Sequence, residues 1–293
     1  MSNSIIPPDA LDKIARRYGL GKYAGTKPAV RDNHPGVVSQ GVSHNDDWFT
    51  FENLELSPGQ NETIKLNTSL FPGQSQNQQW WWTLAQSNPA AGVPYNGVIL
   101  YQMAHRIFTL RDDRAYQKEV SELQNLLQED WQTEYPHTGT KLTYGTNLET
   151  TIEHLQLDGT IISTQVNVPE FTVYATNDNW SYLVLAKEQP ESELGTVETI
   201  PSEAIPLLET LLGAHYEEAG AVFQHLSTRK NGNLREVKLW VPSTKARPCQ
   251  RALVLGVGNY DGFNISTLDD ITNAGPARGV VAQKISGESG GRR

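Results

Sequence analysis

The chain has 293 residues, which is long enough for one large domain or two small ones. Apolar residues make up 38% of the chain and charged residues 19%. Both fractions are below those of typical globular proteins, so uncharged polar residues are abundant. No run approaches the ~20 apolar residues that span a bilayer, and the first residues lack the apolar core of a secretory signal. The composition therefore predicts a soluble protein of the cytoplasm, or of an assembled particle, without a membrane partner.

The net charge of −9 is distributed unevenly along the chain. Basic residues outnumber acidic ones by six to two in residues 1–31, by seven to one in 229–251 and by four to one in 277–293. Residues 32–228 instead carry 26 acidic and seven basic residues. Two interpretations are open. The basic segments meet phosphates or the acidic surface of a neighbouring copy, or they are ordinary solvated surfaces on which like charges happen to cluster.

The first residues predict a short helix followed by an extended arm. Apolar residues recur at helical spacing from Leu11 to Tyr18, after Asp9 as a candidate N-cap. Residues 20–47 are rich in Gly, Pro, Asn and His and show no periodicity. We expect three parts: an N-terminal arm with a short helix at 1–47, a globular core at 48–285 that divides, if at all, near 132–140, and a disordered tail at 286–293.

The core begins with two strand signals and a tryptophan cluster. Residues 48–56 and 63–70 predict two strands joined by turn-forming residues. Trp80, Trp81 and Trp82 are consecutive, and neither helical nor strand periodicity allows all three to face one side. We therefore expect at least one of them at an interface.

Helical signals then give way to strand signals. Residues 96–131 predict two consecutive helices broken near 109–112, and 133–145 predict a loop. The Asp158-Gly159 pair predicts a tight hairpin turn between two strands. Four strands, at 151–157, 160–168, 171–176 and 180–186, are expected to form an antiparallel meander.

The rest of the chain alternates between the two types of element. Helices are expected at 203–212, 214–226 and from Ser266 to about 275, and strands at 236–241, 251–256 and 280–285. The predicted fold class is α+β, with one antiparallel sheet or two packed sheets, helices packed on one side and an extended N-terminal arm.

Two glycine-rich motifs resemble catalytic or cofactor-binding signatures without meeting their structural requirements. The Gly256-Val257-Gly258 turn has the wrong spacing to Gly262 for a dinucleotide site. Residues 287–291 match a nucleophile elbow, but the chain ends two residues later and cannot hold the serine in place. Neither motif predicts an enzyme.

Candidate metal and thiol sites are equally weak. His215 and His225 are ten residues apart, or ~15 Å along a helix, which is too far for one metal ion even with Glu218 between them. The His44-Asn45-Asp46-Asp47 segment has no partner at a metal-loop spacing. Cys249 lies among arginines but has no identifiable base. We therefore predict no catalytic residue, no metal and no cofactor.

The basic segment 229–251 is the candidate contact site for a polyanion or a neighbouring subunit. Basic grooves with stacking aromatics bind single-stranded nucleic acid, and Trp240 lies beside Lys238 in the same strand. The candidate contact residues are Arg229, Lys230, Arg235, Lys238, Lys245, Arg247 and Arg251, and the candidate interface aromatics are Trp80, Trp81 and Trp82.

Three classes of function remain open. The preferred one is a non-enzymatic, self-assembling structural protein, such as a coat-like subunit, that forms homo-oligomers and contacts nucleic acid or a neighbouring copy through its basic segments. The alternatives are an enzyme with a dispersed active site that one sequence does not reveal, and a protein-binding module that uses Trp80–Trp82.

Overall fold

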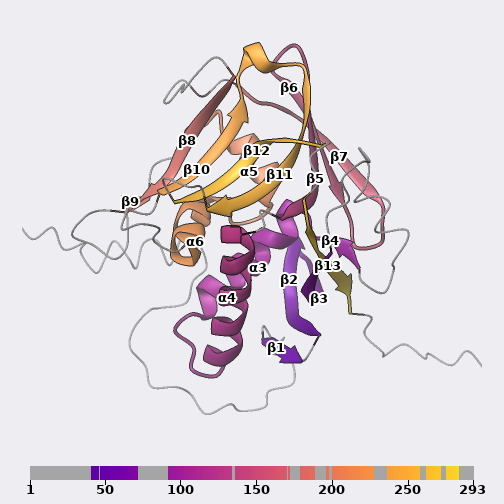
Figure 1. Cartoon of the computed structure of the whole chain (residues 1–293), viewed down its shortest axis with the longest axis vertical. Coiled ribbons are helices and arrows are strands. Elements are labelled where there is room, and N and C mark those ends of the chain that lie inside the picture. Colours follow the sequence, from indigo (N-terminus) through magenta and orange to yellow (C-terminus); the bar gives the residue numbers. More distant parts are fainter. Residues whose placement is uncertain are drawn as a thin grey trace, which may run out of the picture. The chain divides into compact units, whose positions relative to one another are not determined.

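The computed structural model of the chain is shown in Figure 1. It describes residues 41–45, 47–71, 92–133, 136–169, 171, 179–188, 196–197, 200–227, 236–257, 262–271 and 275–283. The chain divides into two units, residues 1–38 and residues 39–293, and every described residue belongs to the second. The predicted N-terminal helix, Trp80–Trp82 and the predicted C-terminal tail lie outside the described residues.

A five-stranded antiparallel sheet combines the first and the last described strands. Its members are β1 (Val42–Asn45), β2 (Trp48–Ser57), β3 (Gln60–Phe71), β13 (Ala277–Ala282) and β4 (Val93–Pro94), in that spatial order. The strands predicted at 48–56 and 63–70 are confirmed as β2 and β3. The turn at Pro58 and Gly59 joins them, where Gly59 adopts a positive φ of 74° that suits glycine.

An eight-stranded sheet forms the second β layer. Its members are β7 (Ile161–Asn167), β6 (Glu149–Leu155), β5 (His137–Tyr144), β11 (Cys249–Val257), β12 (Phe263–Asp270), β10 (Glu236–Pro242), β8 (Trp180–Lys187) and β9 (Thr196–Val197), in that spatial order. Among these neighbours β10 and β12 are parallel, and the other pairs are antiparallel.

The described helices pack against one face of this larger sheet. They are α3 (Gly97–Leu110), α4 (Gln117–Thr133), α5 (Ile205–Leu212) and α6 (Ala219–Leu226), with two 3-10 turns, η3 (Tyr216–Glu218) and η4 (Thr244–Ala246). α3 contacts the three other α-helices as well as β2 of one sheet and β5 of the other, while α4 and α6 contact β11 and β10 (Figure 1). The predicted α+β class, with helices on one side of an antiparallel sheet, is confirmed.

Helix α3 begins where three segments approach closely. Asn96 caps the helix by accepting a hydrogen bond from the Ile99 backbone N–H at 2.9 Å, and its amide donates to the Leu155 carbonyl at 2.9 Å. A Cβ on Gly97 would lie 2.4 Å from the Leu211 carbonyl oxygen, so only glycine lets α5 come this near. The N-terminus of α3 is therefore fixed against both α5 and the β6 end.

A buried ion pair joins α4 to the five-stranded sheet. Arg278 of β13 is 2% exposed and donates two hydrogen bonds to the Asp130 carboxylate, at 2.8 and 2.7 Å. Its third bond, at 2.8 Å, goes to the Asn67 carbonyl of β3. Part of the positive charge counted at the C-terminal end of the sequence is thus neutralised inside the protein.

Three local predictions are wrong, and tertiary pairing explains each. The segment expected as a loop at 133–145 contains β5, which is paired on both sides by β6 and β11. The helix expected from Ser266 is the strand β12, held between β10 and β11. The third strand expected for the meander, at 171–176, lies outside the described residues apart from Phe171, and the fourth, β8, has β10 and β9 as its neighbours, so the expected four-stranded order does not form.

Candidate functional site

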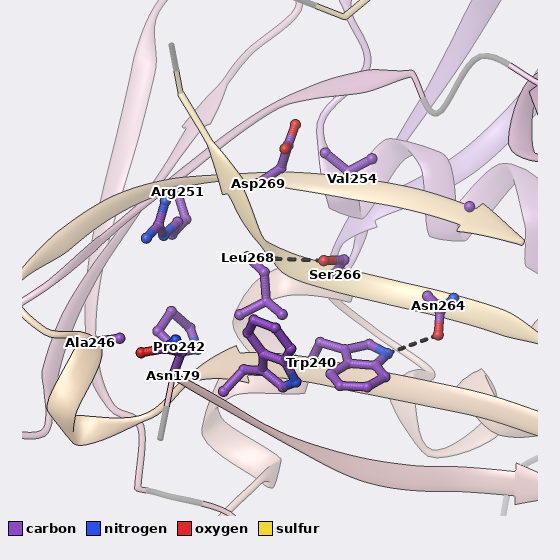
Figure 2. A pocket seen from close by; sticks show the side chains of 12 residues that line it. Asn179, Trp240, Pro242, Ala246, Arg251, Val254, Asn264, Ser266, Leu268 and Asp269 are labelled. Carbon is purple, nitrogen blue, oxygen red and sulfur yellow. Dashed lines mark hydrogen bonds between the residues drawn. The ribbon is translucent and has the colours of Figure 1, made fainter. Parts of the chain in front are cut away.

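A hollow of about 840 Å³ lies on the face of the eight-stranded sheet that points away from the hydrophobic core. On β10, Leu239 and Val241 face the core, whereas Trp240 and Pro242 line the hollow. Successive side chains of a strand point to opposite faces. The same alternation on β11 and β12 places their outward residues around the hollow, so three adjacent strands build its floor (Figure 2).

A bulge in β12 changes which side chains reach this hollow. Val254 of β11 pairs with Ser266, and Ala252, two residues earlier in β11, pairs with Asp269, three residues later in β12. The extra residue on β12 breaks the strict alternation of a strand. Two consecutive residues, Leu268 and Asp269, therefore both line the hollow. The Leu268 backbone N–H donates to the Ser266 hydroxyl at the bend, at 3.3 Å (Figure 2).

The wall of the hollow combines aromatic and aliphatic side chains. Trp180 is 37% exposed, which makes it one of the few large apolar side chains on the described surface. Trp240 packs against the ring of Tyr182 with 4.5 Å between ring centroids. Pro242, Ala246, Val254 and Leu268 add aliphatic side chains to the lining. The hollow thus offers broad apolar surfaces to a ligand.

The polar side chains of the hollow are held in place by neighbours. The Trp240 indole N–H donates to Asn264 Oδ1 at 2.8 Å, so the Asn264 amide group has a fixed orientation (Figure 2). Asp269 Oδ2 lies 2.6 Å from Nε2 of His137, whose side chain is 3% exposed. Such pre-positioned groups are what a specific binding site requires.

The charges that line the hollow balance each other. Among its described lining residues, Arg251 and Asp269 carry a charge and the others are neutral. Arg251 also pairs with Asp270, with 3.2 Å between Nη1 and Oδ2. The hollow is therefore not a basic cavity, although it borders the predicted basic segment.

The structure places four of the seven predicted basic contact residues, namely Lys238, Lys245, Arg247 and Arg251. Lys238 pairs with Glu236 at 3.1 Å, and its side chain is 8% exposed. Arg247 is buried, donates to the carbonyl oxygens of Val168 and Pro242, and stacks over Tyr144. Arg251 lines the hollow as described above.

Lys245 is exposed in η4, on the loop between β10 and β11. Arg229, Lys230 and Arg235 lie outside the described residues, as do Trp80, Trp81 and Trp82. The four described basic residues do not gather into one exposed patch, because Lys238 and Arg247 turn toward carbonyl or carboxylate partners of their own sheet.

A histidine–glutamate cluster connects α3, η3 and β2. His105 Nε2 lies 3.1 Å from Glu218 Oε2, and the rings of His105 and His215 stack with 4.9 Å between centroids. His215 Nε2 lies 3.8 Å from Glu55 Oε2. The hydrogen bond from His105 lowers the pKa of Glu218, and burial of the carboxyl opposes this effect. His105 and His215 are 110 residues apart in the sequence, so no local motif could reveal the cluster.

The described residues contain no group of three or more His, Cys, Asp and Glu side chains arranged to hold a metal ion. His44, part of the segment weighed as a metal loop, instead pairs with Glu122 at 2.9 Å and stacks on Phe49. His225 packs edge-on against Phe108 rather than beside His215.

The outer edge of β7 is a second candidate site, because it is a long strand edge that is exposed to solvent. All seven residues Ile161–Asn167 are exposed except the half-buried Val166, and β7 pairs with β6 in one continuous register without a bulge. Within the described part of the chain, no strand pairs with the other edge of β7. Residues 159–168 include neither a charged residue nor a proline.

The other three sheet edges differ from β7. β9 and β4 have two residues each, and β4 contains Pro94. β1 has four residues, and its His44 is bound to α4 through Glu122. Short strands, prolines and covering contacts prevent pairing with another chain. β7 also contacts a helix, α5, but among the edges that the structure describes it alone combines seven residues, a regular register and the absence of charge and proline.

A further hollow, of about 770 Å³, lies between β7 and the five-stranded sheet. Ile162 of β7, Leu56 of β2 and Val280 of β13 contribute apolar walls, and Glu62 and Asp158 contribute negative charge. This hollow adjoins the exposed edge, so any chain that pairs with β7 would border it.

No helix within the described ranges is both long and apolar enough to cross a membrane. No protein-family model, no curated protein and no solved structure matches this chain.

Proposed function

We propose that this chain is a self-assembling structural protein and that copies first associate by antiparallel pairing of two β7 strands. The observation that carries the proposal is the seven-residue, uncharged and regular edge of β7, in a protein whose other described edges are short or covered. An edge of this kind is a template for another strand, and an edge that is not meant to pair usually carries a charge, a proline or a bulge.

The backbone of β7 fixes which groups would make the contact. The Thr160 carbonyl accepts from Gln156, and the Val168 N–H donates to Leu148, so these two even-numbered residues bond toward the β6 side. Antiparallel pairing alternates along a strand. The backbone N–H and C=O groups that point outward therefore belong to the odd-numbered residues, Ile161, Ser163, Gln165 and Asn167.

A second copy of β7 matches this pattern when the two-fold axis passes through Thr164. Ile162 then faces Val166 of the other copy, and Ser163 faces Gln165. β-Branched residues thus meet β-branched residues at Ile162–Val166 and Thr164–Thr164, and neutral polar residues meet at Ser163–Gln165, which favours cross-strand pairing, while Ile161 faces Asn167 at the two ends. An interface that uses the same patch on both copies must be self-complementary in this way. This match is why we choose a second copy as the partner of β7.

Exposed apolar side chains at both ends of β7 also support the proposed pairing of two copies. Leu148, Ile161 and Ile162 are 43%, 46% and 53% exposed, and they are the three most exposed large apolar side chains among the described residues. Leu148 adjoins one end of β7, and the two isoleucines lie at the other. Pairing would remove apolar surface at both ends of the strand from water.

A larger assembly needs a second contact, because a two-fold pairing closes into a dimer. We propose for that role the basic residues of 229–251 other than Lys238, Arg247 and Arg251, which make contacts within their own copy. The acidic residues of 32–228 on a neighbouring copy, or a nucleic acid, are the proposed counterpart. The two contacts respond differently to salt. Pairing of the uncharged β7 is insensitive to ionic strength, whereas the charged contact weakens as salt is added.

The experiment that tests the dimer is sedimentation of the wild type and of a Gln165→Pro variant from micromolar to millimolar protein. Proline at this position removes one outward-facing N–H and leaves the bonds to β6 intact, because proline is tolerated at an edge whose N–H faces solvent. We expect a wild-type dimer and a monomeric variant with an unchanged circular dichroism spectrum and melting temperature.

Two charge variants make the test specific to the proposed register. Ser163→Lys with Gln165→Lys places like charges opposite each other across the axis and should dissociate the dimer. Ser163→Lys with Gln165→Glu places opposite charges there and should restore it. A wild type that stays monomeric at millimolar concentration would overturn the proposal, and so would a dimer that persists in both Gln165→Pro and the double lysine variant.

A further inference from the structure

We propose that the hollow on the outer face of the eight-stranded sheet binds an uncharged saccharide. The hollow is independent of the β7 edge, since β6 and β5 separate β7 from β11, β12 and β10, which build the hollow. Its volume of about 840 Å³ lies within the ~300–1,000 Å³ of typical small-molecule sites. It has room for more than one sugar ring.

The aromatic residues of the hollow suit the apolar face of a sugar ring. Trp180 is 37% exposed although it is large and apolar, and Trp240 lines the same wall. The C–H groups of a pyranose ring carry slight positive charge and pack against the negative face of an aromatic ring. Exposure of an indole in a hollow, rather than in the core, is what such stacking requires.

The polar groups suit the hydroxyls of the same ligand. Asn264 uses its Oδ1 to accept from the Trp240 N–H, which leaves its Nδ2 group turned the other way as a donor. Asp269 is a partly exposed acceptor whose position is fixed by His137 at 2.6 Å. Ser266 adds a hydroxyl between them on β12. A site that offers both hydrogen-bond donors and hydrogen-bond acceptors beside aromatic rings matches a ligand that carries many hydroxyl groups.

The charge of the hollow discriminates against phosphorylated ligands. Arg251 and Asp269 balance each other among the described lining residues, and Arg251 is already paired with Asp270 at 3.2 Å. A phosphate placed here would meet the Asp269 carboxylate and a guanidinium that already pairs with Asp270. A nucleotide could stack on the tryptophans, but its phosphate would be repelled. We therefore favour an uncharged sugar over a nucleotide.

The test titrates each probe into the full chain and measures binding by calorimetry and by tryptophan fluorescence. The probes are the methyl pyranosides of glucose, galactose, mannose, xylose and N-acetylglucosamine, together with cellobiose and maltose. Glucose 6-phosphate and AMP form the charged arm of the experiment. We expect at least one neutral probe to bind about tenfold or more tightly than either phosphate-bearing probe.

Three variants locate the binding. Trp180→Ala removes an exposed ring and should weaken the best probe about tenfold, and Asn264→Ala should weaken it through loss of the amide donor. Trp48→Ala, in the five-stranded sheet, is the matched tryptophan control and should bind as the wild type does. If the loss of Trp180 disturbs the fold, Asn264→Ala still tests whether the probe binds in the hollow.

Each outcome decides the proposal. Binding of a neutral pyranoside that is lost in Trp180→Ala or Asn264→Ala and kept in Trp48→Ala supports it. The absence of binding for every neutral probe at millimolar concentration would overturn it. Tighter binding of AMP than of any sugar would also overturn it, in favour of a nucleotide site. Sugar binding that both hollow variants retain would assign the sugar to another surface and overturn the proposal as well.

Discussion

The buried imidazole of His154 accepts a hydrogen bond from the hydroxyl of Thr140, with 2.8 Å between Nδ1 and Oγ1. Its Nε2 lies 2.8 Å from the Thr210 carbonyl oxygen, so Nε2 carries the proton and donates it. The Thr140 hydroxyl in turn accepts from the Gly97 backbone N–H at 2.9 Å. This chain of bonds connects β6 to β5, to the first residue of α3 and to α5, and it fixes a neutral tautomer of His154.

We predict that this site makes the protein acid-sensitive below about pH 6.5. Burial lowers the pKa of His154, and the hydrogen bond to the Thr210 carbonyl only partly opposes this effect. As the pH falls below the ordinary histidine pKa of about 6.5, the unfolded chain takes up a proton before the folded chain does, so the free energy of unfolding decreases. Denaturant unfolding at a series of pH values measures the slope.

The variant His154→Gln should lose this slope and cost about 1–2 kcal/mol at neutral pH through the broken hydrogen bonds. His44→Gln, on an exposed strand, is the matched control and should keep the slope. A wild type whose stability is constant between about pH 7 and pH 5 would contradict the assignment of a neutral buried imidazole.

A second prediction concerns the buried pair of Arg278 and Asp130. Asp130→Asn leaves the Arg278 charge buried without a carboxylate and should destabilise the protein by about 3–5 kcal/mol. Asp112→Asn removes a carboxylate that is 88% exposed from its pair with Arg111 and should change stability by less than about 0.5 kcal/mol. Denaturant unfolding measures the free energy of unfolding of both variants, and the two losses of stability are compared. Equal effects of the two substitutions would show that Arg278 does not depend on Asp130.

Apolar replacement of both partners extends this test. The double variant Asp130→Leu with Arg278→Met should be more stable than Asp130→Asn alone, since neither member then leaves an uncompensated buried charge. A double variant that is less stable than the single one would indicate that the pair is needed for packing as well as for charge balance.

The same pair shows what the sequence could and could not predict. Strands with clear turn residues, such as the Asp158-Gly159 hairpin, and the helices α3 and α4 follow from local patterns and were predicted correctly. The contacts of the basic residues could not be predicted in this way, because a count of basic residues does not reveal their partners. Arg278 is separated by 148 residues from the carboxylate that neutralises it, and Arg247 by 79 from a carbonyl that it binds.

The missed strand β5 has a related cause. His137, Thr138 and Thr140 are polar, so the segment resembles a loop, yet all three are buried. The Thr138 hydroxyl donates to the Leu253 carbonyl of β11, and the Thr140 hydroxyl bonds to His154 of β6. Buried polar groups are tolerated when they have such partners. Those partners lie far along the chain and are invisible in a local window.

The hollow was missed for a third reason. Its lining depends on the β12 bulge, which turns both Leu268 and Asp269 to one face. Sequence alone indicated a helix at this point, because Ser266 and Asp269 resemble a capping pair. Pairing with β10 on one side and β11 on the other overrides that local preference.

A third prediction addresses Gly275, which packs against the ring of His137. A Cβ at this position would lie 2.4 Å from His137 Cδ2 and 2.7 Å from Nε2, the atom that contacts Asp269. Gly275→Ala should therefore displace the imidazole and destabilise the protein by about 1–3 kcal/mol. In a His137→Ala background the same substitution should cost less, and the double-mutant cycle measures this coupling. Additive effects of the two substitutions would contradict a direct clash.

The last prediction concerns the histidine–glutamate cluster at lower pH. The hydrogen bond from His105 lowers the pKa of Glu218 against the opposing effect of burial. A lowered carboxyl pKa means that the ionised form is favoured in the folded protein, so this contribution is present above the unfolded pKa of about 4.5 and is lost as the pH falls through the lower, folded value. Glu218→Gln should remove that acid-dependent part of the stability. Because the carboxylate is partly exposed, we expect a cost of about 1 kcal/mol or less near neutral pH.

The neighbouring Glu217 provides the matched control for this cluster, since it lies in the same turn and is exposed. Glu217→Gln should leave the acid slope of the unfolding free energy unchanged between about pH 5 and pH 3, whereas Glu218→Gln should flatten it. His105→Gln should flatten the slope as well, because the hydrogen bond from this imidazole is the largest cause of the lowered Glu218 pKa. If the pH dependence of the unfolding free energy is unchanged in both Glu218→Gln and His105→Gln, other carboxylates cause the acid sensitivity, and the histidine–glutamate cluster does not contribute to it.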